Sequence, residues 1–452
     1  MSDNRTPEWD AYDASHPAAP SGESADSIAQ SAVQRVRDGS PRRGIPVKKR
    51  HRGLKITLIA VLAVVLAMGG GLAYAWYDLN SKIHQVPVDP YLPTISRPPT
   101  STPTATVKYP GDPFAGRAMN ILVMGTDSRE GANAGISADD PGGARADTTF
   151  IAHVSADRTR VDIVSIPRDL LIVIPQCLGP NGKVIPEAGW GNQEFNAAYA
   201  WAYQEGDTST GAACAIRATE ALTNVRIDAY VVIDFMGFVN VVDAIGGIDV
   251  TLLCPMKAKQ AGVNLPAGVS HLDGMTAVGL ARARTGSAGV GDGSDLSRIR
   301  RQHALFNAIF DKVFAMNYVT DFPKLYSLVR SVLESIQTDI GDLAGIAGLA
   351  YSLKNFDTSQ INFVTVPVHT AASNPNRVDL SKQQAKPYFD ALQNDTPLPS
   401  STTAAPAQTA VAPPGGETTA PPVDPAATTA PETTAPVELP PAAIQTAYDC
   451  QF

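Results

Sequence analysis

The sequence predicts an α/β fold, a three-layer α-β-α sandwich with a central mixed sheet, preceded by one transmembrane helix. Three observations lead to this prediction: an uncharged run near the N-terminus, short apolar segments that alternate with helical periods, and Pro-rich stretches that bound the alternating region. Strands interleaved with helices indicate a sheet covered on both faces. The alternating region, residues 114–393, is long enough to bury one large core.

The uncharged run, Ile56 to Tyr77, has 22 residues. At about 1.5 Å per residue it spans a hydrocarbon core of roughly 30 Å. Basic residues between Arg42 and Lys55 precede it, so the positive-inside rule predicts a cytoplasmic N-terminus and an extracytoplasmic domain. A cleaved signal peptide is the alternative, but the basic leader and the apolar run are both longer than such peptides have.

Composition divides the chain into six parts. They are a disordered cytoplasmic tail (1–53), the transmembrane helix (54–77), a Pro-rich linker (78–113), the globular domain (114–393), a disordered Pro/Thr-rich tail (394–446) and a C-terminal segment with Cys450 (447–452). The linker composition favours extended conformations, so we expect it to be a semi-rigid spacer between membrane and domain. The two tails lack a sustained apolar period, as disordered segments do.

Within the domain, short apolar or β-branched runs predict strands that are buried on both faces. These runs are Asn120–Met124, Thr149–Val154, Val161–Ser165, Leu170–Ile174, Tyr230–Ile233 and Ile361–Val366. Helical periods predict the helices that cover the sheet. They are Gly211–Leu222, Phe235–Ala244, Gly274–Arg284, Leu296–Phe314, Phe322–Ser335, Leu343–Leu353 and Pro387–Gln393.

All four cysteines follow the apolar run, on the side expected to be oxidising. None has the C-x-x-C spacing of a zinc site, so the sequence predicts disulfides. Four cysteines allow three pairings, and the sequence alone does not choose among them. We favour Cys177 with Cys214 and Cys254 with Cys450, the second of which would hold the end of the tail against the domain.

Arginines gather with aspartates in short motifs between Gly125 and Gln302, although the net charge of the chain is -8. The arginines are Arg129, Arg145, Arg168, Arg282, Arg284, Arg298 and Arg301. Guanidinium groups next to one or two carboxylates can hold a diphosphate and its metal ion. Arg168, Arg282 and Arg284 could each instead be a surface residue or part of a structural ion pair.

The helix that opens at Leu296 presents charge near its N-terminus, where either Ser294 or Asp295 is a suitable N-cap. Asp295, Arg298 and Gln302 stand at i, i+3 and i+7, so they share one face of that helix. Because a helix N-terminus favours anions, this face predicts a phosphate site. A solvated charged face beside an ordinary cap is the alternative.

Two aspartates adjoin predicted strands. Asp127 follows the strand at Asn120–Met124, and Asp147 precedes the strand at Thr149–Val154. Such a pair could hold Mg²⁺ (or Mn²⁺), which prefers one or two carboxylates plus substrate phosphates to a cage made only of protein. Each aspartate alone could equally be a turn former.

The order of these motifs resembles that of the LytR-CpsA-Psr family of cell-envelope proteins. The matching segments are Gly125 to Arg129, Arg145 to Thr148, Ser165 to Asp169, Asn196 to Tyr199, His271 to Gly274, Arg282 to Arg284 and Asp295 to Gln302. The resemblance implies a phosphotransferase that moves a glycopolymer from a polyprenyl diphosphate carrier to peptidoglycan and forms a phosphodiester link. It also implies that the membrane, the polyprenyl-linked glycan and peptidoglycan are the partners.

The resemblance assigns roles to individual residues. Asp127 and Asp147 would bind magnesium, Arg145 would brace the metal side of the site, and Asp295 would orient the arginines or serve as base. The diphosphate would be contacted by Arg168, Arg282, Arg284, Arg298 and Gln302. The family encloses its lipid in an apolar channel, for which the candidates are Phe235, Phe238, Val239 and Val242, although ordinary core packing also explains each of these four.

The sequence departs from the family pattern at two places. Leu280 stands where an aromatic residue is frequent, and a glycine-rich insertion, Gly286 to Gly293, lengthens the loop between Arg284 and Asp295. Three other functions stay open: a transcriptional regulator, a non-enzymatic polyprenyl-lipid binding protein, and a hydrolase of the diphosphate. Nucleic acid is not an expected partner, because the chain is acidic and shows no helix-turn-helix pattern.

Overall fold

The computed structural model describes residues 52–92, 97–101, 111–128, 144–203, 207–317, 320–399, 445 and 450, with the backbone alone at 52–60 and 189–192. The chain divides into two compact units, Met1–Gly70 and Gly71–Phe452. One described helix, α2 (Arg52–Asn80), is long and apolar enough to cross a membrane, in agreement with the predicted span. Arg129 and the N-terminal tail lie outside the described residues.

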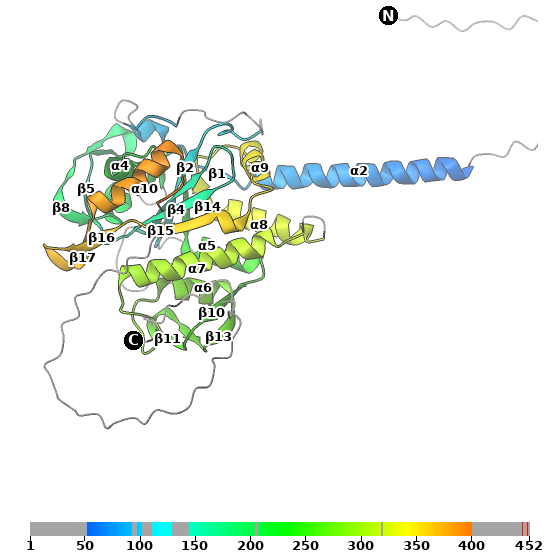
Figure 1. Ribbon diagram of the computed structural model, residues 1–452. Coiled ribbons are helices and arrows are strands. Elements are labelled where there is room, and N and C mark those ends of the chain that lie inside the picture. The colour runs from blue at the N-terminus through cyan, green and yellow to red at the C-terminus, as the bar shows by residue number, and fades with distance from the viewer. Residues whose placement is uncertain are drawn as a thin grey trace, which may run out of the picture. The chain divides into compact units, whose positions relative to one another are not determined.

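A seven-stranded mixed sheet forms the centre of the domain, as predicted (Figure 1). In spatial order its strands are β1 (His84–Gln85), β14 (Ile336–Thr338), β9 (Ala229–Asp234), β2 (Met119–Thr126), β3 (Ala146–Val154), β4 (Val161–Ile166) and β15 (Ile361–Thr365). The pairs β1–β14, β2–β9 and β4–β15 are parallel, and the other three pairs are antiparallel. Antiparallel β3 and β4 bring the start of β3 beside the end of β4.

Helices cover both faces of this sheet (Figure 1). They are α3 (Ala197–Ala202), α4 (Ser209–Thr223), α5 (Phe235–Ala244), α6 (Gly274–Arg282), α7 (Asp295–Phe314), α8 (Phe322–Ser335), α9 (Leu343–Ser352) and α10 (Lys382–Asn394). The main core joins α3, α4 and α10 to buried side chains of β2, β3 and β4 such as Leu122, Ile151 and Val164. On the other face, α7 contacts the sheet through Phe306, whose ring meets that of Phe150 edge to face at 5.2 Å.

Five two-stranded sheets complete the domain. Their strands are β5 (Leu171–Ile174) with β8 (Ala188–Glu194), β6 (Cys177–Leu178) with β7 (Val184–Ile185), β10 (Ile248–Leu252) with β13 (Gly268–Leu272), β11 (Met256–Ala258) with β12 (Val263–Leu265), and β16 (Val368–Ala371) with β17 (Asn374–Leu380). The expectation that Leu170–Ile174 is buried on both faces is therefore wrong. A turn closed by Leu170 N–H donating to Pro167 O directs the chain away from the central sheet, and β5 alternates buried with partly buried residues.

Part of the expected linker, 78–113, belongs to the domain. Strand β1 pairs with β14, and the side chains of Val88 and Leu92 are buried in the main core. Arg97 donates two hydrogen bonds from Nε and one from Nη2 to the carboxylate of Glu220 on α4. The edge strand comes before the first proline of this segment, Pro87, and the apolar residues that stand between the prolines supply the core contact.

Both favoured disulfides are present. Cys177 is bonded to Cys214, with Cα atoms 5.3 Å apart, and Cys254 is bonded to Cys450, with Cα atoms 5.8 Å apart. The first joins β6 to α4. The second fixes the C-terminal segment to the region after β10.

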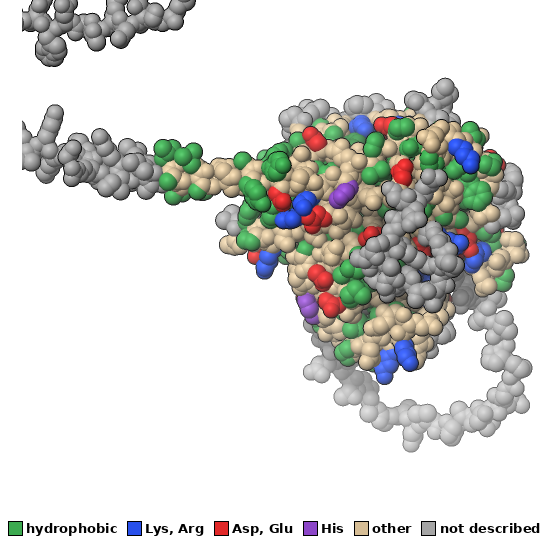
Figure 2. Space-filling model, turned by 180° about the vertical axis from the view of Figure 1, so that it is seen from behind, with side chains coloured by type: hydrophobic (Ala, Val, Ile, Leu, Met, Phe, Trp, Pro, Cys, Tyr) green, Lys and Arg blue, Asp and Glu red, His purple; other side chains and the backbone are tan. Residues whose placement is uncertain are grey.

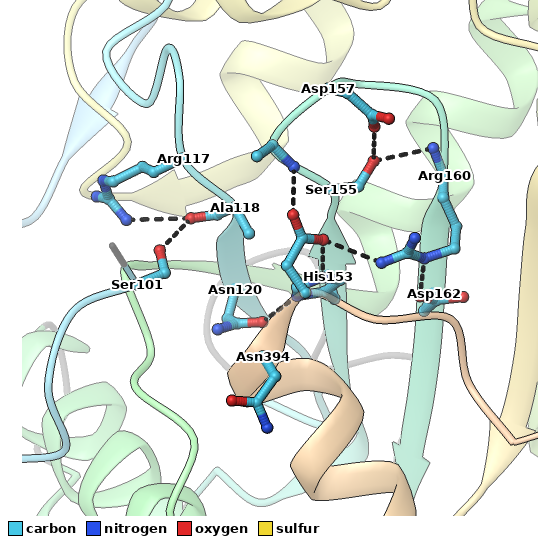
Figure 3. A network of polar contacts seen from close by, with 12 residues as sticks. Ser101, Arg117, Ala118, Asn120, His153, Ser155, Asp157, Arg160, Asp162 and Asn394 are labelled. Carbon is cyan, nitrogen blue, oxygen red and sulfur yellow. Dashed lines mark hydrogen bonds and ion pairs between the residues drawn. The ribbon is translucent and has the colours of Figure 1, made fainter. Parts of the chain in front are cut away.

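A polar network ties β2, β3 and β4 to the end of α10 (Figure 3). The buried ring of His153 makes hydrogen bonds of 2.7 Å with Asn120 Oδ1 and 3.1 Å with Asp395 Oδ1. Arg160 pairs with Asp162 at 2.7 Å and with Asp395 at 2.9 Å. Asp395, expected at the start of a disordered tail, therefore closes the fold at the sheet end away from the motif residues of β3 and β4.

Candidate active site

Three charged residues from separate elements meet at one edge of the sheet. Asp147 stands at the start of β3, Arg168 follows β4, and Asp295 opens α7. Arg168 Nη1 donates to Asp147 Oδ1 at 2.8 Å, and the backbone N–H of Arg168 donates to Asp295 Oδ2 at 3.2 Å. Because β3 and β4 are antiparallel, the motif at the start of β3 and the motif after β4 lie side by side. The structure thus gathers residues that are far apart in sequence.

The first turn of α7 completes this cluster. Ser294 is the N-cap, since its hydroxyl accepts from Ser297 N–H at 3.3 Å. Asp295 forms an ion pair with Arg298, and Arg298 Nη2 also donates to the backbone O of Asp147 at 3.1 Å. The N-terminal turn of α7 therefore presents both a carboxylate and a guanidinium to the end of the sheet.

Burial and neighbouring charges shift the pKa values of the cluster residues. Burial raises the pKa of the Asp295 carboxyl above its ordinary value, although Arg298 acts in the opposite direction. It likewise lowers the pKa of the Arg298 guanidinium. Burial acts to lower the pKa of Arg168 too, but Asp147, Asp169 and Asp295 outweigh it and raise that pKa. A carboxylate with a raised pKa among arginines is suited to accept a proton.

The cluster also contains buried polar atoms without a hydrogen-bond partner. Asn196 Oδ1, Arg298 Nε and Thr149 Oγ1 are such atoms. Asn196 is held nearby because its Nδ2 donates to Asp147 Oδ1 at 3.1 Å. Since buried polar groups are normally paired, these atoms indicate a place where a polar ligand would supply the missing partners.

Asp127 and Asp147 are linked through the backbone of Arg145. The N–H groups of both aspartates donate to Arg145 O at 3.1 Å, and Arg145 N–H donates to Asp127 Oδ1 at 2.7 Å. The Asp147 side chain accepts hydrogen bonds from Arg168 and Asn196, and both end on Oδ1. Within the described ranges no group of three His, Cys, Asp or Glu side chains could hold a metal. Two carboxylates are as many as Mg²⁺ commonly takes from a protein when phosphates supply its other ligands, so the donor set of Asp127 and Asp147 is compatible with that ion.

The guanidinium of Arg145 lies near a carboxylate outside the cluster of Asp147, Arg168 and Asp295. It is half exposed, at 51%, and lies 3.9 Å from the carboxylate of Glu194. Glu194 is also paired with Arg377 of β17. Arg145 therefore braces the two aspartates through its peptide group, while its side chain joins a neighbouring ion-pair network.

The remaining predicted diphosphate residues surround the end of α6. Arg282 lies over the ring of Phe235, with 4.6 Å from its Cζ atom to the ring centroid, and Arg284 is exposed. Gln302 is buried and its Nε2 donates to Ala281 O at 3.4 Å. Arg301 is buried as well and donates to Val290 O and Ala283 O, so it supports the backbone that carries Arg282 and Arg284.

The sheet face beneath α5, α7 and α8 is apolar and incompletely covered. On β2, Leu122 and Met124 are buried on the α4 side, whereas Val123 on the opposite side is only partly buried, as is Ile121, which packs in a cluster with Met119. The helices on that side form their main buried cluster with one another and with β10 to β13. An apolar face that keeps solvent exposure beside a charged cluster is suited to a ligand with a long hydrocarbon chain.

The predicted channel residues divide into two pairs. Val239 and Val242 are buried, Val242 within the core of the α5–α8 layer, so core packing accounts for them. Phe235 and Phe238 are partly exposed. Because Arg282 lies over Phe235, this ring marks the boundary between the apolar face and the charged cluster.

The comparison with protein families agrees with this arrangement. Residues 101–394 match the LytR_cpsA_psr family, a region that contains all the described cluster residues. The chain belongs to the LytR_cpsA_psr family.

Two relatives are about a quarter identical to this chain over the residues that align. The cell wall biosynthesis protein LcpA of Corynebacterium glutamicum is 28% identical over 62% of this chain and 57% of LcpA, so the match spans less than two thirds of that relative. The enzyme named polyisoprenyl-teichoic acid–peptidoglycan teichoic acid transferase TagU of Enterococcus faecalis is 26% identical over 64% of this chain and 80% of TagU. The crystal structure of B. subtilis TagV is 22% identical to this chain. The superposition covers 62% of this chain and 98% of the TagV chain, with a TM-score of 0.46.

Two residues that the sequence reasoning left without a role stand inside family motifs. Asn196 holds Asp147, and Asp169 Oδ1 lies 3.3 Å from Arg168 Nε. The signal was available, because both occur in the motifs that carried the LytR-CpsA-Psr resemblance. The residue types alone do not mark these two positions, because neither an amide nor a second carboxylate beside an arginine is distinctive by itself.

A third residue without a predicted role, Gln445, lies in the stretch 394–446 that was expected to be a disordered tail. Gln445 is buried, its Nε2 donates to Gly289 O at 2.7 Å, and its Oε1 accepts from Cys254 N–H at 3.1 Å. Gly289 has φ +64, and a Cβ there would lie 2.4 Å from Pro255 O. Gln445 therefore clamps the glycine-rich insertion that this LytR_cpsA_psr chain carries between Arg284 and Asp295.

Proposed function

We propose that the protein is a phosphotransferase that moves a glycopolymer from a polyprenyl diphosphate carrier to peptidoglycan and forms a phosphodiester link in cell wall assembly. The observation that carries this proposal is the cluster of Asp147, Arg168, Asp295 and Arg298, which adjoins an incompletely covered apolar face. A polyprenyl diphosphate has the matching chemistry, a charged diphosphate on a long hydrocarbon. The names of relatives such as TagU support the same class of donor and acceptor.

In this proposal the arginines bind the diphosphate oxygens. Arg168 and Arg298 lie at the N-terminal turn of α7, whose backbone N–H groups add to the attraction for an anion. Arg282 and Arg284 approach from the end of α6. Asp127 and Asp147 are the residues that would hold Mg²⁺ (or Mn²⁺), an ion that withdraws charge from the diphosphate when bound.

Asp295 is the proposed proton acceptor. The acceptor hydroxyl oxygen attacks the phosphorus that bears the glycan, the bond from that phosphorus to the bridging oxygen breaks, and polyprenyl monophosphate leaves. The hydroxyl proton passes to the Asp295 carboxylate, whose raised pKa strengthens it as a base. Arg168 and Arg298 stabilise the negative oxygens of the phosphoryl group in transfer.

We also propose a single-pass membrane protein with a cytoplasmic N-terminus and an extracytoplasmic catalytic domain. The basic residues before α2 and the two disulfides after it support this orientation. On the face shown in Figure 2, acidic and basic side chains of the described residues are interspersed and do not gather into one basic field. That distribution is unlike the basic stripe of a nucleic-acid binding surface.

Reconstitution tests the proposal. The full chain in detergent is incubated with a defined polyprenyl diphosphate glycan, peptidoglycan and Mg²⁺, and the products are analysed by mass spectrometry. We expect a new sugar-phosphate link on peptidoglycan together with polyprenyl monophosphate. Release of glycan phosphate without a link would identify a hydrolase, and binding of the donor without any product would identify a lipid-binding protein. A soluble fragment should begin before His84, because β1 belongs to the central sheet.

A further inference from the structure

The end of α2 is fastened to α8 by three polar contacts. Tyr326 Oη donates to Asp78 Oδ2 at 2.5 Å, and Arg330 Nη1 lies 3.6 Å from the same oxygen. Lys82 Nζ lies 3.0 Å from Glu334 Oε1. Tyr326, Arg330 and Glu334 are spaced four residues apart and so share one face of α8. This face runs along the last residues of the apolar helix and the turn that follows it.

The pairing of these residues fixes the direction of α8. Asp78 pairs with Tyr326 and Arg330, whereas Lys82, farther along the chain, pairs with Glu334. Residues 78–82 and helix α8 therefore run parallel to each other. The N-terminal end of α8 thus points in the direction of the residues that precede Asp78, such as Tyr77, and Phe322 lies about 6 Å farther along α8 in that direction than Tyr326 does, at about 1.5 Å per residue.

Two large apolar side chains are exposed at this end of α8, beside the charged pair of Asp321 and Lys324. Phe322 is 48% exposed and Phe314, the last residue of α7, is 38% exposed. The connection between them is closed by hydrogen bonds, because Asp321 N–H donates to Asn317 O at 2.9 Å and Asn317 N–H donates to Asp321 Oδ2 at 3.0 Å. The side chain of Lys324 is 69% exposed in the first turn of α8. We call Phe314, Phe322 and Lys324 the docking end.

We propose that the docking end rests in the headgroup region of the bilayer that α2 spans. This inference depends on α2 being a membrane helix, as proposed above, and not on the transfer reaction. Trp76 and Tyr77 are exposed at the end of the apolar run, where aromatic side chains mark the membrane–water boundary. The contacts of Asp78 set the first turn of α8 beside that boundary. Two phenylalanines with a neighbouring lysine suit the boundary between acyl chains and anionic headgroups.

Docking would place the charged cluster at a defined height above the membrane. Helix α7 runs from Asp295 in the cluster to Phe314 at the docking end, and its 20 residues make it about 30 Å long. Phe306, Ile309 and Phe310 are partly exposed along α7. A polyprenyl chain that enters beside the docking end could follow these side chains to the cluster without crossing water.

Spin labels measure the depth of the docking end directly. All four native cysteines are in disulfides, so a cysteine introduced by Phe322→Cys is the one thiol available for labelling. The full chain is reconstituted in vesicles of phosphatidylglycerol and phosphatidylcholine, and the accessibility of the label to oxygen and to a water-soluble nickel complex is compared. Lys324→Cys serves as a second site if Phe322→Cys does not fold. Val184→Cys is the matched control, since Val184 is an equally exposed apolar residue of β7, at 54%.

We expect the label at residue 322 to lie about 5–10 Å below the lipid phosphates, and the label at residue 184 to be accessible from water. Labels at 322 and 324 with the accessibility of residue 184 would overturn the proposal. A third label at Trp76→Cys reports on the span, and a water-accessible label there would overturn both the span and the docking. None of these readings requires a glycan donor, so they are independent of the proposed transfer reaction.

Discussion

Arg168 donates from Nη1 to Asp147 Oδ1 at 2.8 Å, which joins the end of β4 to the start of β3. The Nε atom of the same guanidinium lies 3.3 Å from Asp169 Oδ1 and 3.8 Å from Asp295 Oδ1. One planar group thus holds three carboxylates, and the raised pKa of Arg168 reflects their combined charge. This arrangement fixes the carboxylate of Asp147, a proposed metal ligand, relative to that of Asp295, the proposed base.

Replacement of Arg168 by lysine should therefore impair turnover more than donor binding. Lys keeps the positive charge, but one ammonium cannot reproduce the planar set of donors. We expect kcat to fall about a hundredfold, as for the loss of one donor to a transition-state oxyanion, with a smaller change in affinity for the polyprenyl diphosphate. Steady-state kinetics and donor binding measure the two effects. Arg377→Lys, which alters an ion pair with Glu194 outside the cluster, is the matched control.

The pH profile of transfer tests Asp295 as the proton acceptor. The carboxylate is the active form and burial raises its pKa, so kcat/KM should fall with decreasing pH at a higher pH than an ordinary aspartate would produce. Asp295→Glu should retain this acidic limb, and Asp295→Asn should abolish it along with most of the activity. An unchanged acidic limb in Asp295→Asn would assign the proton to another group.

His303 should make the fold sensitive to mild acid. Burial lowers its pKa from 6.5 to about 4, and its Nε2 is 2.7 Å from Ser165 Oγ of β4. The unfolded chain takes up the proton at the higher pH, so this contribution to stability is complete above pH 6.5 and is lost as pH falls toward 4. The loss should reach about 3 kcal/mol.

Urea denaturation of the full chain in detergent between pH 7 and pH 4 measures this loss. His303→Gln removes the titrating group while retaining an amide that can bond to Ser165. The variant should lose less stability than the native chain over this pH range. Equal losses in both proteins would show that His303 does not control the acid sensitivity.

Gln445 should position the loop between Arg284 and Asp295. Gln445→Ala removes two hydrogen bonds and leaves Gly289 O and Cys254 N–H without that partner. The free energy of unfolding should fall by about 1–3 kcal/mol, and amides of residues 286–293 should exchange faster with solvent. Hydrogen exchange by mass spectrometry checks the loop. Gln360→Ala, at an exposed position, should leave the exchange of this loop unchanged.

Local sequence patterns predict the long elements of the fold. The apolar runs at β2, β3, β4, β9 and β15 and the capped helix α7 depend on neighbouring residues, and these predictions are confirmed. Strands β1 and β14, of two and three residues, were not predicted, because their pairing is determined by partners far away in the chain. The apolar run at β5 was assigned to the central sheet, since periodicity does not reveal which sheet a strand joins.

In the candidate site too, local motifs predict some residues, whereas others depend on contacts between distant parts of the chain. Aspartates and arginines in dense motifs identified Asp147, Arg168, Asp295 and Arg298 before their contacts were known. Gln445 could not be found in this way, because it lies in a polar Pro/Thr-rich context and 191 residues from Cys254. Its burial depends on the three-dimensional position of the tail end, which the Cys254–Cys450 disulfide determines.

Asp147→Asn provides the most direct test of the proposed transferase. The variant keeps the size of the side chain and a carbonyl oxygen that can accept from Arg168, but it loses the charge that would secure the metal. Donor binding and formation of the peptidoglycan link are measured in parallel for the native chain and for Asp147→Asn. Asp390→Asn is the matched control, because this side chain of α10 is 44% exposed and lies outside the cluster. We predict that Asp147→Asn lowers link formation at least about a hundredfold and weakens donor binding much less. Link formation at the native rate would contradict the account and favour a protein that binds the polyprenyl lipid without this chemistry.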